Sequence, residues 1–306
     1  MQTKAIRIGT RGSPLALAQA EETANRLAQA NRLARSDIEI VVIRTTGDRV
    51  TDRPLSEAGG KGLFAKEIED ALLAGTIDLG VHSAKDMPTL LPDGLVLAGY
   101  LPREDVRDAF ISRRGASLAD LPSNAVLGTS SLRRRAMALR RRPDLQVVEL
   151  RGNVETRLRK LREGVADATL LALAGLRRLG LADQATSLLD EKTFVPAAGQ
   201  GAITLEIRSA DERAAALVAG IADLNTGIAV TTERAFLAAL DGSCRTPIGG
   251  YAVVEGDAIA FHGLIITPDG TQAFEAMRQG RVGEGERLGR DAGEELKKRG
   301  GPRFFG

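Results

Sequence analysis

The stretch GQGAITLEIR, residues 199–208, decides how we interpret the fold of this 306-residue chain. It is an apolar run behind two glycines, which is typical of a buried strand, and a helix is expected after it at 210–221. Two sets of alternating strands and helices precede it. We expect this late strand to return to the first set, which gives two α/β lobes with crossing segments and a cleft between them. Such clefts are the usual ligand sites.

Residues 5–101 predict the first lobe. Its expected strands are 5–10, 38–46, 78–84 and 94–101, and its expected helices are 13–32 and 63–75. Ser13 is placed to cap the first helix, with Pro14 at the first helical position. Apolar strands that alternate with amphipathic helices indicate a largely parallel sheet covered on both faces. Residues 47–62 are polar and glycine-rich, and we expect a long loop there.

Two further segments follow the first lobe. A second alternating set has expected strands at 108–113, 124–131 and 145–152, helices at 132–142 and 154–163, and a strand and helix within 168–180. Helix 228–240, an antiparallel meander over 250–280 and helix 282–299 then predict a small α+β domain. The fold class is therefore α/β, with two lobes and a third domain built on a three-stranded antiparallel sheet. The predicted domains are 1–101 with 200–221, then 102–199, then 222–306.

The composition is that of an ordinary globular protein, with 43% hydrophobic and 27% charged residues. We find no apolar run of about 18 residues and no signal peptide, so we expect no membrane partner. A single cysteine fits a reducing cytoplasm, and with two histidines it makes a closed zinc site improbable, so we predict no metal. The net charge of +2 predicts no polyanionic partner.

Basic residues nevertheless cluster in the second lobe. Between Arg133 and Arg162 there are eleven basic and three acidic residues, a local charge of +8. Arg133 and Arg134 follow Thr129, Ser130 and Ser131 into the first turn of a helix, where the helix dipole disfavours cations. That misfit favours a role in binding an anion.

The same arrangement occurs at two more strand ends. Arg151 ends a strand and Arg157 lies one turn into the next helix, while Arg11 and Ser13 follow the first strand. The alternative for each is a solvated helix face, which we expect for Arg140, Arg141, Arg142 and Arg159. For the other arginines we favour anion binding.

The composition narrows the kind of anion. A site for nucleic acid would combine basic residues with aromatic stacking platforms, but aromatic residues make up 3% of the chain and tryptophan is absent. The stretch around Lys61 lacks the leading glycine and the hydroxyl residue of a phosphate-binding loop. Separate guanidinium forks suit a small ligand that carries several carboxylates, because each fork binds one carboxylate through two hydrogen bonds. We therefore expect no nucleic-acid partner.

Two single residues stand out for chemistry. Asp86, in VHSAKDMP (81–88), follows a strand and could stabilise a developing cation or accept an N–H bond, although an ordinary pair with Lys85 is the alternative. Cys244, in LDGSCRTPIGGY (240–251), lies in a turn beside Arg245. A turn favours exposure of the thiol, which could be reactive or could be a permanent attachment point.

Nine motifs, in order along nearly the whole chain, closely resemble porphobilinogen deaminase, also called hydroxymethylbilane synthase. They are RIGTRGSPLALAQA (7–20), GGKGLFAKEIEDALL (59–73), DLGVHSAKDMP (78–88), REDVRDAF (103–110), LGTSSLRRR (127–135), LRGNVETRL (150–158), LALAGLRRLG (171–180), PAAGQGA (196–202) and ERAFLAALDGSCRTPIG (233–249). The resemblance is weakest over 209–230 and in the meander.

The resemblance implies three domains, the first two like a hinged periplasmic binding protein. It implies a dipyrromethane cofactor held by a thioether to Cys244. The family adds four porphobilinogen units to this primer, releases ammonia each time, and frees the linear tetrapyrrole 1-hydroxymethylbilane. The family's catalytic aspartate matches Asp86, which would bond pyrrole N–H groups. Each pyrrole carries an acetate and a propionate, in agreement with the arginine forks.

Further roles are carried over by motif. The predicted cofactor contacts are Ser83, Lys85, Thr129, Ser131, Arg133, Arg134 and Gln200. The predicted substrate contacts are Arg11, Ser13, Arg151, Arg157 and Arg178. The loop 47–62 matches a mobile lid, with Lys61 and Phe64 at its edge. The resemblance also implies a cytoplasmic monomer with no partner macromolecule.

Two other classes of protein are alternatives to this function. A non-catalytic two-lobed protein that binds organic anions would carry a secretory signal and would need neither a third domain nor a thiol in a turn. An RNA-binding protein would use the basic cluster at 133–162 and would show steep salt dependence.

Overall fold

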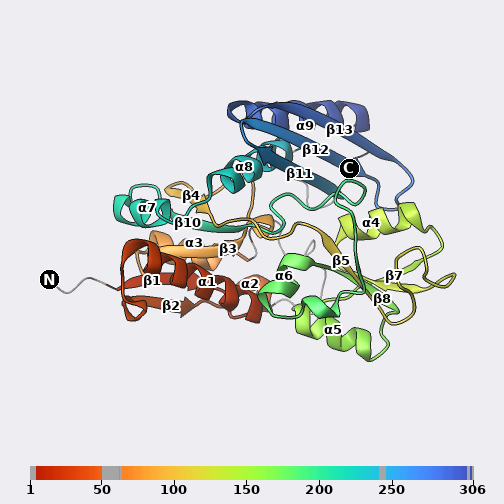
Figure 1. Cartoon of the computed structure of the whole chain (residues 1–306), viewed down its shortest axis with the longest axis horizontal. Coiled ribbons are helices and arrows are strands. Elements are labelled where there is room, and N and C mark those ends of the chain that lie inside the picture. Colours follow the sequence, from red (N-terminus) through yellow and green to blue (C-terminus); the bar gives the residue numbers. More distant parts are fainter. Residues whose placement is uncertain (1–4, 50–61, 63, 241–245, 302–303, 305–306) are drawn as a thin grey trace. The chain divides into compact units, whose positions relative to one another are not determined.

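The computed structural model describes residues 5–49, 62, 64–240, 246–301 and 304. The chain divides into two compact units. Unit 1 is Met1–Glu104 with Ala202–Gly227, and unit 2 is Asp105–Gly201 with Ile228–Gly306. The strand within residues 199–208 thus belongs to the first unit, as expected. Figure 1 gives the element labels used below.

The described part of unit 1 contains a five-stranded sheet in the order β2-β1-β3-β10-β4. The strands are β1 (Ile6–Thr10), β2 (Ile38–Val42), β3 (Leu79–Ser83), β4 (Leu95–Tyr100) and β10 (Ile203–Arg208). Strand β1 is parallel to β2 and β3, whereas β10 is antiparallel to β3 and β4. Strands β1, β2, β3 and β4 thus run in the same direction, which confirms a largely parallel sheet, and β10 is the exception. The chain re-enters this unit where β3 ends, so β10 has to run the opposite way.

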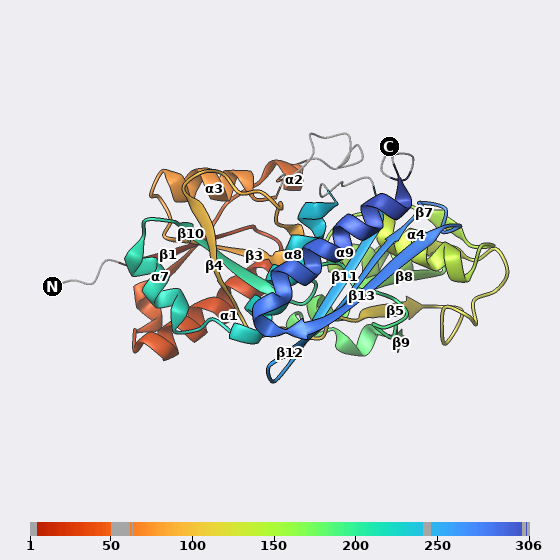
Figure 2. The ribbon, with the colours of Figure 1, turned by 90° about the horizontal axis from the view of Figure 1, so that it is seen from above.

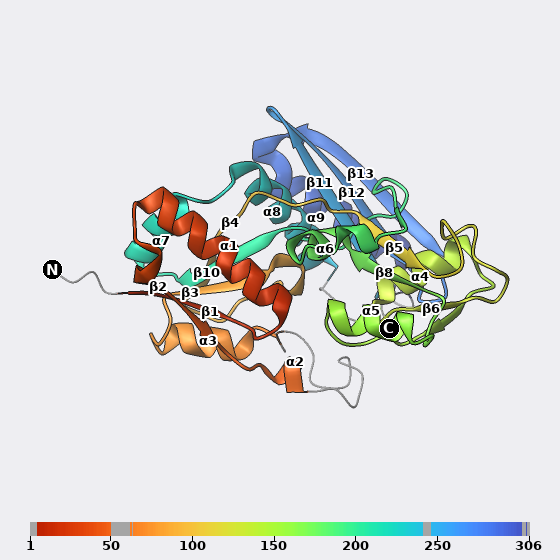
Figure 3. The same ribbon diagram turned by 60° about the horizontal axis from the view of Figure 1, so that its bottom comes forward.

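Helices cover both faces of this sheet. They are α1 (Pro14–Asn31), α2 (Thr46–Arg49), α3 (Lys66–Leu73) and α7 (Glu212–Ala219), with short 3₁₀ turns at Arg35–Asp37 and Ala84–Asp86. Figures 2 and 3 show α1 and α3 on opposite faces. The Ser13 side chain accepts a hydrogen bond from Ala16 N at the start of α1, which confirms the predicted cap. Leu27 of α1 and Ile68 of α3 are fully buried.

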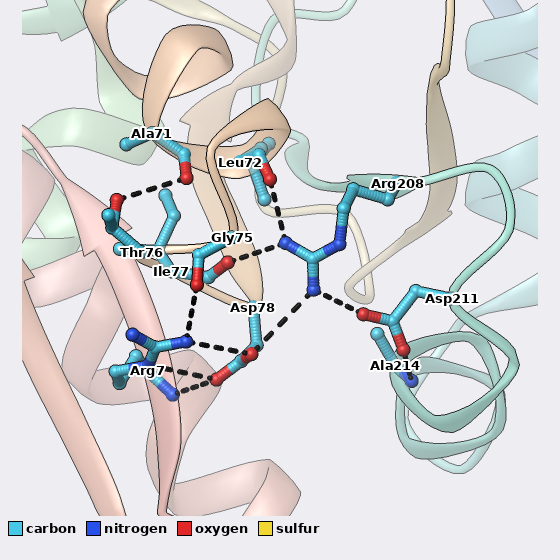
Figure 4. Close-up of polar contacts among 10 residues, drawn as sticks. All are labelled: Arg7, Ala71, Leu72, Gly75, Thr76, Ile77, Asp78, Arg208, Asp211 and Ala214. Carbon is cyan, nitrogen blue, oxygen red and sulfur yellow. Dashed lines mark hydrogen bonds and ion pairs between the residues drawn. The ribbon is translucent and has the colours of Figure 1, made fainter.

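A polar network holds the edge of this sheet where β1 and β3 begin and β10 ends (Figure 4). Arg7 donates from its backbone N to Asp78 Oδ2 at 2.9 Å and from its side chain to the same carboxylate. Arg208 Nη1 donates to the carbonyls of Leu72 and Ile77, both at 2.7 Å. Its Nη2 lies 3.7 Å from Asp78 Oδ1. The opposite edge, where β1 and β3 end, thus remains for the predicted site.

In its described residues unit 2 contains a second five-stranded sheet, in the order β7-β6-β8-β5-β9. Its strands are β5 (Asp108–Ser112), β6 (Val126–Gly128), β7 (Gln146–Val148), β8 (Ala168–Ala172) and β9 (Ser187–Leu188). Its helices are α4 (Leu132–Arg141), α5 (Val154–Arg162) and α6 (Leu173–Arg178), with a 3₁₀ turn at Ala182–Gln184. Strands β6, β7 and β8 are parallel, and β5 is antiparallel to β8 and β9.

Unit 2 also contains the predicted meander. Strands β11 (Ile248–Glu255), β12 (Ala258–Ile266) and β13 (Ala273–Arg281) form an antiparallel three-stranded sheet. Helices α8 (Leu224–Ala239) and α9 (Gly285–Gly300) accompany it, with a 3₁₀ turn at Val282–Glu284. Phe236 of α8 packs on Phe261 of β12 with ring centroids 5.0 Å apart. The class α/β with a small antiparallel third sheet is thus confirmed.

The third sheet shares a core with the second. Leu264 and Ile266 of β12 belong to one buried cluster with Phe110 of β5, Leu127 of β6 and Phe194. Residues 105–201 and 228–306 therefore make one compact unit. The division into three domains stays a prediction.

Among the described residues, no single helix has both the length and the apolar character needed to span a membrane. Taken together, α7 and α8 reach that length and composition, but they are bent by 114° at the break between them.

Candidate functional site

A pocket of about 70 Å³ lies in unit 1, at the edge where β1 and β3 end. Five of the residues predicted from the sequence line it, namely Arg11, Ser13, Phe64, Ser83 and Asp86. The connection between β1 and α1 supplies the first two, and β3 and the turn after it supply the last two. The two strands are parallel neighbours, so their carboxyl ends come together, as the pattern of strand ends predicted.

The side chains in this pocket are arranged for a polar ligand. The Arg11 guanidinium lies over the Phe64 ring, 4.1 Å from its centroid. Asp86 is exposed in the turn Ala84–Asp86. Gln19 Nε2 donates to Ser83 Oγ at 2.9 Å and so fixes that hydroxyl. Sequence reasoning missed Gln19, although a buried amide on the inner face of a helix whose neighbours are alanines could have drawn attention to it.

A second constellation lies in unit 2 around Asp108, the first residue of β5. The Asp108 carboxylate is fully buried and accepts from Arg133 Nη2 at 2.7 Å, Arg134 Nη2 at 2.7 Å and Gln200 Nε2 at 3.0 Å. Burial alone would raise the pKa of Asp108, but the charges and hydrogen bonds of the two arginines hold it well below the ordinary range. Sequence reasoning missed Asp108, because 25 residues separate it from Arg133.

Asp108 also explains the two cations in the first turn of α4. The misfit predicts a ligand, but both guanidinium groups are buried and paired with Asp108. The inference from the misfit is therefore insufficient, since the fold itself uses both side chains. Two guanidinium charges against one carboxylate still leave a net charge of +1 in the interior.

The turn before α4 has the predicted form. Strand β6 ends at Gly128 and α4 begins at Leu132. Ser131 is the N-cap, and its hydroxyl accepts from Arg134 N at 3.3 Å. The Thr129 hydroxyl accepts from Ser131 N at 3.1 Å. The hydroxyl groups thus order the turn, and the predicted contact of Thr129 and Ser131 with a cofactor stays a prediction.

The remaining predicted arginines of unit 2 already interact with the protein. Arg151 follows β7 and pairs with Glu149, and Arg157 lies in the first turns of α5 as expected. Arg178, at the end of α6, donates to the carbonyl of Gly201 at 3.1 Å. These contacts orient the side chains and do not test their predicted binding to substrate.

Of the arginines for which we expected solvated helix faces, Arg159 agrees with the expectation and Arg142 does not. Arg159 is 57% exposed and pairs with Glu163, in agreement with the expectation. Arg142 instead donates to the carbonyls of Leu118, Ala119, Leu121 and Pro122 and pairs with Asp144. The expectation is wrong for Arg142, which fastens the 118–122 loop to the end of α4.

The comparisons with known proteins agree over both units. Residues 6–216 match the family model described as porphobilinogen deaminase, dipyromethane cofactor binding domain, and residues 228–298 match its C-terminal domain. A porphobilinogen deaminase from Nitrobacter hamburgensis is 61% identical over 97% of this chain and 94% of its own. One from Paracoccus denitrificans is 57% identical over 98% and 96%. This chain belongs to the porphobilinogen deaminase family.

Solved structures similar to this chain include the methionine-binding protein MetQ. The identity is 17%, the TM-score is 0.46, and the match covers 71% of this chain and 90% of that one.

The cluster around Asp108 fits the anionic cofactor of the porphobilinogen deaminase family. Arg133 is 5% exposed, and its Nε is buried with no hydrogen-bond partner among the described residues. An unpaired buried donor in a cluster of net positive charge is costly in the folded protein. A carboxylate placed there would supply both the acceptor and the missing negative charge. Cys244 and Lys61, which the family resemblance also brings in, lie outside the described residues, as does Arg245 beside Cys244.

Proposed function

We propose that this chain is a porphobilinogen deaminase, which joins four porphobilinogen units into the linear tetrapyrrole 1-hydroxymethylbilane and releases ammonia. The observation that carries the proposal is the pocket of unit 1, which holds Asp86 together with Arg11 and Ser13. A pyrrole with two carboxylate arms needs a carboxylate for its N–H and a guanidinium or hydroxyl for its arms.

Asp86 is the catalytic group in this proposal. Loss of ammonia from the aminomethyl group leaves a cation that is delocalised over the pyrrole ring and its nitrogen. A carboxylate that accepts the pyrrole N–H stabilises that charge as it develops. Asp86 lies in a short turn directly after β3, so the sheet fixes its position in the pocket.

The arginines bind and orient the carboxylate arms. In unit 1, Arg11 and Ser13 would hold the incoming porphobilinogen, and the Phe64 ring supports the Arg11 guanidinium. In unit 2 we assign the same role to Arg151, Arg157 and Arg178. Bidentate bonds to carboxylates fix both position and orientation, which raises the rate by holding the reacting carbons together.

A second set of residues would hold the dipyrromethane, which supplies the pyrrole carbon on which the chain of pyrroles begins. Cys244 is the attachment residue in this proposal. The proposed contacts are Ser83, Lys85, Thr129, Ser131, Arg133, Arg134 and Gln200. Three of them share the buried Asp108, so their donors are ordered before any ligand arrives. We also propose that the protein is a cytoplasmic monomer without membrane or nucleic-acid partners, and that Lys61 and Phe64 lie at the edge of a lid.

The decisive measurement is the mass of the intact purified protein. We expect a covalent adduct of the size of two pyrrole units in the wild type and none in Cys244→Ser. Incubation with porphobilinogen should release ammonia and the tetrapyrrole in the wild type only. A folded, unmodified wild type that consumes no porphobilinogen would refute the proposal.

A further inference from the structure

Beneath the pocket of unit 1, a buried histidine–glutamate pair lies within electrostatic reach of a second buried glutamate. Glu69 of α3, Glu206 of β10 and His82 of β3 lie between the sheet and α3. His82 Nε2 is 3.0 Å from Glu206 Oε2, and these two side chains are 5% and 0% exposed. Glu69 is 6% exposed. A glycine makes room for them, because a Cβ at Gly80 would lie 2.9 Å from His82 Nε2.

The hydrogen bonds of this cluster are incomplete. Glu206 Oε1 and Glu69 Oε1 are both buried and have no hydrogen-bond partner among the described residues. Two unpaired carboxylate oxygens in one interior are costly, because each has lost its water and neither can donate. A proton on Glu69 converts one acceptor into a donor and removes one of two like charges. The geometry therefore calls for an additional proton.

The charges around Glu69 favour the same conclusion. Burial, with the charge of Glu206 as the second cause, raises the pKa of Glu69 to about 7. On α3 itself, Asp70 raises it further and Lys66 lowers it. Strands β1 and β4 also pack on α3, and their ionisable side chains are Arg7, which is bonded to Asp78, and Tyr100.

The cluster adjoins the proposed chemistry. His82 and Asp86 line the same pocket. His82 therefore connects the wall of the pocket where porphobilinogen would react to the buried carboxylates, because its Nε2 lies 3.0 Å from Glu206 Oε2.

The inference rests on the proposed function, because the coupling of two porphobilinogen units releases a proton. The C–N bond of one aminomethyl group breaks with its electron pair on the departing ammonia. A C–C bond forms to the free ring carbon of the other unit, whose C–H bond breaks with its pair left in the ring. We propose that Glu69, Glu206 and His82 form a buried proton acceptor that takes this proton from the pocket.

The first test needs no variant. Infrared spectra of the wild type labelled with ¹³C at the glutamate carboxyl carbon should show a protonated glutamate that ionises near pH 7. The band should be absent from Glu69→Gln, whose side chain has nearly the same size and shape and cannot ionise. A wild type without such a band would overturn the inference.

The second test is the pH dependence of turnover. Below its pKa the Glu69 carboxyl is already protonated and cannot accept another proton. The kcat for porphobilinogen should therefore fall as pH drops through about 7, which gives the pH profile an acid limb. Glu69→Gln should lose this limb and lower kcat about 10²-fold with little change in KM. Asp70→Asn is the matched control, since it removes a charge one residue along α3 at a side chain that is 59% exposed. It should keep the limb and move it slightly to lower pH, because the charge of Asp70 raises the pKa of Glu69.

The outcomes separate the two proposals. A limb in Glu69→Gln identical to that of the wild type would overturn the proton acceptor and leave the proposed function intact. A wild type that carries no adduct and consumes no porphobilinogen would overturn both.

Discussion

A single buried carboxylate organises three of the residues proposed to hold the cofactor. Asp108 bonds Arg133, Arg134 and Gln200, which come from α4 and from the segment before β10. Removing one member of a buried ion cluster is far more harmful than removing an exposed pair, because the remaining charges stay buried. Asp108 is therefore both a determinant of stability and a positioning residue.

We expect Asp108→Asn to lower the free energy of unfolding by about 3–5 kcal/mol, because it leaves two buried guanidinium groups without a counter-charge. Urea denaturation measures the change, and Asp291→Asn, an exposed partner of Arg287 on α9, is the control that should change little. The pKa of Asp108 is lower in the folded state, so its stabilisation is present above the ordinary carboxyl pKa of about 4. This stabilisation should be lost only as pH falls below that value. A loss of stability of the same size near neutral pH would contradict the expectation.

For Asp86 we expect the opposite, a loss of turnover without a loss of stability. Its side chain is exposed, so Asp86→Asn should fold with unchanged thermal stability. Turnover of porphobilinogen should fall by about 10²-fold or more, because an amide cannot balance a developing cation. Asp93→Asn, at another exposed aspartate of unit 1, is the control. A rate for Asp86→Asn close to that of the wild type would remove Asp86 from its role.

At the scale of elements, the two edges of the unit 1 sheet differ in proposed function, one in binding and the other in stability. The edge where β1 and β3 end carries the pocket, and the other edge carries the network of Arg7, Asp78 and Arg208. Arg208 ties β10 to the last turn of α3 through the carbonyls of Leu72 and Ile77. The network therefore supports the elements that carry the site without contacting the pocket.

We expect Arg208→Lys to lower the free energy of unfolding by about 1.5–3 kcal/mol, because an ammonium group cannot reach both carbonyls and the carboxylates together. Hydrogen exchange of amides at the end of α3 should rise. The KM for porphobilinogen should stay unchanged, because the network is at the far edge of the sheet. Arg26→Lys, in a surface pair with Glu22, is the control. A large change in KM would contradict the separation of the edges.

The sequence predicted the elements better than their pairing. Caps such as Ser13 and apolar runs such as 203–208 are local signals, so the helices and strands came out nearly where expected. The antiparallel direction of β10, the partner of Arg133 and the burial of Glu69 depend on residues distant in the sequence. The pattern of α3 gave no sign that one of its glutamates faces inward, because helical periodicity tolerates a single polar residue on the buried face.

At the scale of the whole molecule, one buried glutamate joins the third sheet of unit 2 to the segment that follows β9. Glu233 of α8 accepts from Gly199 N at 2.7 Å through Oε2 and from Ala252 N at 2.8 Å through Oε1. Gly199 lies beside Gln200, and Ala252 belongs to β11 of the third sheet. We therefore expect these parts of unit 2 to unfold together.

We expect Glu233→Gln to destabilise unit 2 by about 1–3 kcal/mol, because one of the two buried amides loses its acceptor. Hydrogen exchange measured on peptides from β8 and from β12 should show the same loss of protection. Glu255→Gln, at the exposed end of β11, is the control. Loss of protection in β12 alone would mean that the third sheet unfolds by itself.

The place of β10 in the chain has a consequence for synthesis on the ribosome. Strand β10 separates β3 from β4, yet some 100 residues lie between β4 and β10 in the sequence. During synthesis, the edges of β3 and β4 that face β10 therefore stay unpaired until β10 emerges. Strands β5 to β9 of the next segment form meanwhile from contiguous sequence. Unpaired strand edges attract other chains. The segment made first is thus completed after the sheet made second, and it is the part of the nascent protein that most needs protection from aggregation.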